Sequence, residues 1–120
     1  MTKTKGQCEA EISTAIIRFE KEYMGRGPDE TRTIIVDDLV IVRLHGVITK
    51  AEHHLAGSGD KGCSLIKETR MQLIEQARPL LDATVHAILG VPVKSLHTDI
   101  STRTGERLII FTLETTPEFK

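Results

Sequence analysis

Two short breaks, at residues 25–28 and 90–92, divide the 120-residue chain into halves with the same layout. Each break combines glycine with proline, ends a helix-patterned segment and precedes two strand-patterned runs. Glycine readily adopts the left-handed conformation that caps a helix, and proline cannot continue one. Residue identity between the halves is weak, so the repetition lies in the layout. It predicts an α+β domain built from two αββ halves.

The helices are predicted from apolar residues at spacings of three and four, which share one helical face. In residues 7–24 these residues are Cys8, Ile12, Ile16, Phe19 and Tyr23. A long helix is predicted over residues 63–89, and Pro79 should kink or divide it because proline lacks an N–H and clashes with the preceding turn. Arg70 lies near its apolar stripe, where it should extend toward solvent or pair with an acidic residue. Thr49 and Glu52 have the spacing of a capping box, which predicts a short helix through about Ala56.

Each half ends in a pair of strands. Residues 31–45 read as a hairpin that turns at Asp37 and Asp38, because β-branched residues flank this pair. Residues 93–101 and 106–114 read as a second hairpin around a turn at 102–105. The simplest architecture is a four-stranded, mostly antiparallel sheet with helices packed on one face. Residues 1–120 then form a single domain, with 1–6 and 115–120 as flexible tails.

The first hairpin is apolar on both faces. One face carries Ile34, Val36, Leu39 and Ile41, and the other carries Ile35, Val40, Val42 and Leu44. A strand that is apolar on both sides is usually covered on both sides, and one layer of helices covers only one. We therefore expect a homodimer, with the interface at Ile35, Val40, Val42 and Leu44.

Composition argues against several functions. A net charge of -1 and an aromatic content of 3% provide neither the basic excess nor the stacking rings of a typical nucleic-acid binder. No apolar run approaches the ~20 residues of a membrane span, and the N-terminus lacks a signal-peptide pattern, so a cytoplasmic protein is expected. Cys8 and Cys63 fit neither a disulfide framework nor a zinc site by spacing, and we expect reduced thiols.

The most interesting polar pattern lies in the second hairpin. Alternation places His97, Asp99 and Ser101 on one strand face, with Glu106 opposite Ser101 across the turn. Such a row could bind a small ligand or a metal ion, and it is also the ordinary appearance of a solvent-facing strand. Its regular spacing does not provide the directed contacts of a catalytic triad. We assign no catalytic residue, cofactor or established metal site, and expect a non-enzymatic protein.

Two glycine-containing segments have alternative interpretations. Gly59 and Gly62 match the Gly-x-x-Gly loop of a KH domain, which clamps a nucleic-acid backbone. Asp60 would repel phosphate there and the chain lacks a basic excess, so a flexible linker between helices is the favoured explanation of the glycines. Arg26 and Gly27 could offer a guanidinium and a backbone N–H to an anion, or could form a helix stop with a surface arginine.

Several segments together resemble one bacterial family, the MpsC type. They are the Gly-Arg-Gly-Pro helix end at 25–28, the strand at 39–47, the capping box at 49–52 and the segment 97–107. The resemblance covers residues 7–114, and 97–107 is its most specific part. The family is named for a Na⁺-translocating, membrane-potential-generating system. The resemblance implies a small soluble companion of membrane proteins that handle cations or bicarbonate, acting as an accessory or regulatory domain through protein contacts.

Overall fold

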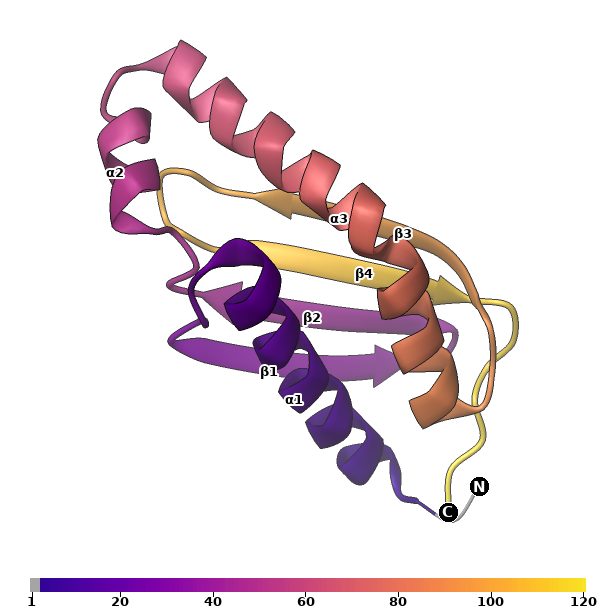
Figure 1. Ribbon diagram of the computed structural model, residues 1–120. Coiled ribbons are helices and arrows are strands. Elements are labelled where there is room, and N and C mark those ends of the chain that lie inside the picture. The colour runs from indigo at the N-terminus through magenta and orange to yellow at the C-terminus, as the bar shows by residue number, and fades with distance from the viewer. Residues whose placement is uncertain (1–2) are drawn as a thin grey trace.

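Four antiparallel strands form one open sheet in the order β1-β2-β4-β3, and the helices lie on one side of it (Figure 1). The computed structural model describes residues 3–120. Its elements are α1 (Lys5–Met24), β1 (Glu30–Val36), β2 (Leu39–His45), α2 (Lys50–Ala56), α3 (Asp60–Leu89), β3 (Val93–Ile100) and β4 (Arg107–Leu113). The predicted α+β class, the two αββ halves and the one-sided helical layer are confirmed. The halves join where β2 pairs with β4.

Local capping signals define α1 and α2. Thr4 and Gln7 form a capping box that begins α1 two residues earlier than predicted, and Gly25 ends it in the left-handed conformation at φ 83°. At α2, the Thr49 hydroxyl accepts a hydrogen bond from the Glu52 N–H at 3.2 Å, and the Glu52 carboxylate accepts one from the Thr49 N–H at 3.0 Å. This second capping box confirms the prediction at residues 49–52.

The long helix α3 is continuous. Its 30 residues span ~45 Å at ~1.5 Å per residue. This is close to the 49 Å longest dimension of the domain. Pro79 lies inside α3 and does not divide it. The helix begins at Asp60, three residues before the predicted start, and Gly90 ends it at φ 74°.

The first hairpin turns where the sequence predicts. Val36 pairs with Leu39, which leaves Asp37 and Asp38 as the turn residues. Asp37 has φ 53°, a positive value that the tight turns of two-residue hairpins require. Short acidic side chains tolerate this conformation better than branched ones do.

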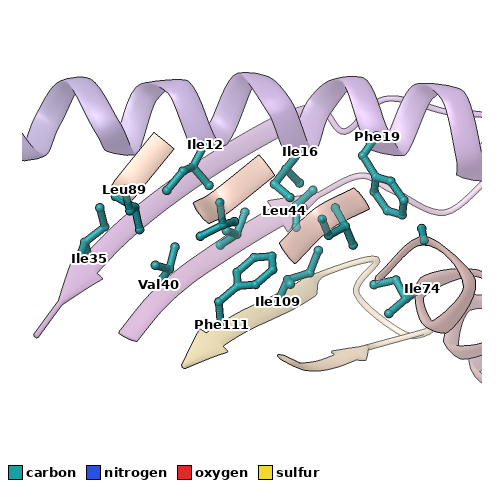
Figure 2. Packing of buried hydrophobic residues seen from close by; sticks show 14 of the residues in the cluster. Ile12, Ile16, Phe19, Ile35, Val40, Leu44, Ile74, Leu89, Ile109 and Phe111 are labelled. Atoms are coloured by element: carbon teal, nitrogen blue, oxygen red, sulfur yellow. The ribbon is translucent and has the colours of Figure 1, made fainter. Parts of the chain in front are cut away.

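The core lies between the sheet and the helices, and it corrects the predicted dimer interface. Ile35, Val40, Val42 and Leu44 are at most 1% exposed and belong to this core. Figure 2 shows Ile35, Val40 and Leu44 between the sheet and α1, close to Ile12 and Ile16. The prediction that these four residues contact another subunit is wrong, because the helices of the same chain cover that hairpin face. The opposite face of the hairpin is the uncovered one.

The C-terminal segment packs on the domain. Pro117 is buried and Phe119 packs against the core. The Lys120 N–H donates a hydrogen bond to the Lys3 carbonyl at 3.0 Å, which places the C-terminal residue beside the start of α1 (Figure 1). Residues 115–120, expected as a flexible tail, thus make contacts with the rest of the domain. Of the expected tail at 1–6, residues 1 and 2 lie outside the described residues.

Candidate functional site

The structure brings together three of the four predicted ligand residues. A hollow of about 360 Å³ at the β3–β4 turn is lined by Asp99, Ser101 and Glu106, together with Lys67 and other residues of the turn. The Ser101 N–H donates to the Glu106 carbonyl at 2.8 Å, so these two residues lie opposite each other as predicted. His97 does not line the hollow, although it is exposed on the same strand.

The carboxylates of this hollow already have cationic partners. Lys67 lies 3.4 Å from Asp99, and Arg43 lies 2.9 Å from Glu106. The described residues, 3–120, contain no group of three His, Cys, Asp or Glu side chains placed to hold a metal ion. What the hollow offers a polar ligand is therefore a set of hydroxyl and backbone groups between these paired charges, together with the side chain of Arg103, which also lines it.

The structure gives Arg26 and Gly62 local roles. The Arg26 guanidinium donates to the Gly46 carbonyl at 2.8 Å and pairs with Asp29 at 2.9 Å, which ties the α1–β1 connection to the end of β2. Gly62 lies in the first turn of α3, where a Cβ atom would collide with the carbonyl oxygen of Leu55 in α2. Close packing of the two helices thus accounts for this glycine, whose segment is helical.

A group of four charged side chains, three of them buried and one partly exposed, joins elements distant in the sequence, and we call it the charge cluster. It consists of Glu20 from α1, Glu52 from α2, Arg70 from α3 and Arg107 from β4. Glu20 is fully buried, and Arg70 and Arg107 are only 3% and 2% exposed. Two acidic and two basic groups balance each other, which is what burial of charge requires.

Arg70 is the most highly connected member of the charge cluster. Its guanidinium donates two hydrogen bonds of 2.7 Å to the Glu52 carboxylate and one of 2.8 Å to the Val47 carbonyl. It also lies 4.0 Å from Glu20. Arg107 completes the group at 3.5 Å from Glu20. The expectation that Arg70 pairs with an acidic residue is confirmed.

Burial and pairing act in opposite directions on these groups. Burial raises the pKa of Glu20, and the guanidinium groups of Arg107 and Arg70 offset only part of that effect. Burial also raises the pKa of Glu52, but the hydrogen bonds from Arg70 and Thr49 outweigh it and leave that pKa below its usual value. Burial lowers the pKa of Arg107, opposed by Glu20. The charge cluster holds three helices and a central strand together.

An open sheet face lies opposite the helices. Its residues form three rows across the strands β1, β2, β4 and β3, as the pairing register shows. The rows are Arg32, Arg43, Leu108 and Asp99; Ile34, Ile41, Ile110 and His97; and Val36, Leu39, Thr112 and Ser95. Ile34, Val36 and Leu108 are 36%, 45% and 36% exposed. This apolar surface is the uncovered face of the first hairpin, extended by β4.

A second apolar surface lies in the helical layer. A groove of about 350 Å³ runs between α1 and α3, and we call it the α1–α3 groove. Phe19 and Tyr23 line it from α1 and stack with their ring centres 4.9 Å apart, and Leu80 lines it from α3. Tyr23 and Leu80 are 43% and 49% exposed, so the groove is open to solvent. Arg18 and Glu22 add one charge of each sign.

Comparison with known proteins identifies the family. Residues 4–115 match the family described as "Na+-translocating membrane potential-generating system (MpsC)", and the chain belongs to this family. The chain is 45% identical over 113 residues to a Bacillus subtilis (strain 168) protein, "Uncharacterized protein YbcI", covering 94% of this chain and 90% of that protein. No solved structure matches the chain. None of the helices within residues 3–120 combines the length and apolar character that crossing a membrane requires.

Proposed function

We propose that this member of the MpsC family is a cytoplasmic, non-enzymatic accessory domain of a Na⁺-translocating, membrane-potential-generating system. The observation that carries the proposal is the pair of apolar surfaces on opposite layers of the domain. The open sheet face and the α1–α3 groove both expose large apolar side chains. Exposed apolar patches of this kind mark contacts with other molecules. A domain with two such surfaces can contact one protein on each side.

The charge cluster supports this role because it fixes the geometry of the helical layer. Glu20 and Arg70 join α1 to α3, which are the two walls of the α1–α3 groove. Arg107 connects the same cluster to a central strand of the sheet. A surface that is already formed before binding loses less conformational entropy when a partner docks. We assign the groove to an integral membrane subunit of the system, through an apolar cytoplasmic segment.

The experiment compares two exposed leucines of α3. Leu80 lines the α1–α3 groove, Leu65 lies outside it, and each is 49% exposed. Cells deleted for the gene are complemented with wild type, Leu80→Glu or Leu65→Glu, and the Na⁺-dependent membrane potential is measured with a potentiometric dye. We expect the deletion and Leu80→Glu to lower the potential and Leu65→Glu to preserve it. Copurification of the system's membrane subunit should follow the same order. A potential that is unchanged by the deletion would contradict the proposal.

The hollow at the β3–β4 turn supports a second candidate function, the binding of a small polar ligand. Its lining includes Asp99, Ser101 and Glu106, which supports a polar ligand as its occupant. Bicarbonate and phosphate are suitable probes, and amide chemical shifts are the readout. Binding there should shift the amides of residues 99–106 and should weaken in Ser101→Ala. Without saturable shifts in this segment, neither anion is a ligand of the hollow.

A further inference from the structure

We infer that a second copy of this chain docks on the open sheet face, with the two sheets face to face about a two-fold axis. The axis runs between β2 and β4 and parallel to them. The inference rests on the proposed function in one respect, namely that the domain works through protein contacts. The inference specifies the surface through which two copies contact each other and the orientation of one copy relative to the other.

The charges on the open sheet face point to an acidic partner group. Arg32 and Arg43 are direct cross-strand neighbours, and both are exposed. Like charges in this relation repel each other. Glu106 neutralises Arg43 at 2.9 Å. Within residues 3–120 the Arg32 side chain has no ion pair or hydrogen bond. Glu30, two residues earlier on the same face of β1, does not pair with it, so Arg32 is available to an acidic partner group beside the apolar surface.

The same row of residues contains a suitable acidic group at its other end. Asp99 lies on β3, the strand at the opposite edge of the sheet from Arg32 on β1. Its side chain is 77% exposed, and its Lys67 partner is 3.4 Å away. A two-fold axis between β2 and β4 places β1 of one copy over β3 of the other and keeps each row over itself. Arg32 then faces Asp99 of the second copy, and the contact occurs twice by symmetry.

The remaining rows fit the same arrangement. The axis places Ile41 over Ile110 of the second copy and Val36 over Ser95. The apolar side chains of β2 and β4 therefore meet at the centre, and the charged pairs lie at the rim, which is the usual distribution in an interface. A two-fold axis perpendicular to the strands would instead place Arg32 over Val36 and leave the arginine unpaired. The charges thus select one of the two face-to-face orientations.

The size of the open sheet face predicts a dimer of modest affinity. Its strands of seven or eight residues give a projected area of roughly 440 Å² per copy, at about 4.8 Å between strands and about 3.3 Å per residue. Stable interfaces bury roughly 600–1,000 Å² per partner. We therefore expect a dimer that dissociates on dilution.

The test is sedimentation equilibrium of the purified full chain from about 1 µM to about 1 mM, the range in which dimers of modest affinity dissociate. We expect a rise from 13.3 kDa toward twice that mass for the wild type. Ile41→Glu should raise the dimer Kd at least about 100-fold, because it places a carboxylate at the apolar centre. Leu65→Glu is the control, since it changes an exposed leucine of the helical layer, and it should leave the Kd unchanged.

A charge exchange tests the orientation. Arg32→Asp and Asp99→Arg should each raise the Kd about tenfold, since each breaks two symmetric rim pairs and creates two repulsive ones. The double variant should return the Kd to within about threefold of the wild type. A wild type that is monomeric throughout, or a double variant no tighter than its single parents, would overturn the inference. If the chain forms the dimer but no membrane subunit copurifies with it, only the proposed function is contradicted. If the chain is monomeric and the membrane subunit still copurifies with it, only the dimer is contradicted.

Discussion

Replacing Arg70 with methionine should destabilise the domain severely. Methionine keeps most of the aliphatic length and removes the guanidinium. That guanidinium makes three hydrogen bonds of 2.7–2.8 Å and lies 4.0 Å from Glu20. After the substitution, the Glu52 carboxylate loses two charge-assisted hydrogen bonds, and the fully buried Glu20 keeps only Arg107 as its cation. The charge cluster then carries an unbalanced negative charge.

The expected cost follows from that imbalance. Breaking a buried ion pair by removing one partner typically costs about 3–5 kcal/mol, because a charge is left buried without compensation. Glu52 is 20% exposed, so solvent recovers part of its loss, whereas Glu20 has no such access. We expect a loss of about 3–4 kcal/mol, a large part of the ~5–15 kcal/mol by which domains are stable. In a chain of this length it corresponds to roughly 10–20 °C in Tm.

Urea unfolding at pH 7 followed by circular dichroism measures the loss, since the chain has no Trp and one Tyr and suits fluorescence poorly. Arg78→Met is the matched control, because Arg78 pairs with Asp82 at 3.3 Å on the same helix in a partly exposed position. Such pairs contribute about 0.3–0.5 kcal/mol. Combining Arg70→Met with Glu52→Gln should cost at least ~1 kcal/mol less than the sum of the two single changes. An Arg70→Met cost below about 1 kcal/mol, or strict additivity, would refute the reasoning.

Three further predictions concern packing, pH and thiol reactivity. Gly62→Ala should cost about 1–3 kcal/mol by calorimetry, because its Cβ collides with a carbonyl oxygen of α2, whereas Gly6→Ala, with open space around it, should cost nothing. The stability advantage of wild type over Glu52→Gln should be complete above the ordinary carboxyl value of 4.5 and shrink as pH falls below it, because the folded-state pKa of Glu52 is lowered. Urea titrations at neutral and acidic pH measure this, and an advantage independent of pH would contradict it. Burial raises the pKa of Cys8, so a thiol reagent should modify Cys63 in the native protein and Cys8 only after unfolding; equal rates would contradict this.

Local signals in the sequence predicted the elements well, because they act over a few residues. The turn at Asp37 and Asp38 follows from backbone preferences of the turn itself. The capping box at Thr49 and Glu52 satisfies backbone groups within one helical turn. The sequence pattern predicts a start of α3 three residues too late, because the glycines around Asp60 are typical of a flexible break. The close approach of α2, which requires the glycine there, is a tertiary contact that spacing does not show.

The covered face of the first hairpin could not be chosen from the sequence. Ile35 and Val40 on one face, and Ile34 and Ile41 on the other, are equally apolar residue types. Successive side chains of a strand point to opposite faces, so by residue type either face of this hairpin is equally suited to burial. The choice depends on the side from which α1 and α3 approach, and that is a property of the whole chain. The hairpin does have one apolar face that the helices leave uncovered, as its sequence indicates. That face carries Ile34 and Ile41, and the sequence pattern alone does not identify it.

The sequence indicates which charged residues of the charge cluster are buried. Glu20 follows Ile16 by four residues, and Arg70 follows Ile66 by four, so both are in phase with buried helical positions. Arg107 precedes Ile109 by two residues and is in phase with the buried face of β4. A charged residue in such a position requires an opposite charge nearby. Its partner could not be named, because Glu20 and Arg107 are 87 residues apart in the chain.

Charged side chains differ in their pairing between the interior and the open sheet face. Inside the domain, the buried charges of the charge cluster have partners of opposite sign within the same chain. On the open sheet face, Glu106 neutralises one of two adjacent arginines, and Arg32, beside the exposed Ile34, has no ion pair within residues 3–120. An apolar surface with one unpaired charge is what we expect of one side of a protein interface. Because Asp99 completes it only across a two-fold axis, the imbalance within one chain points to a second copy.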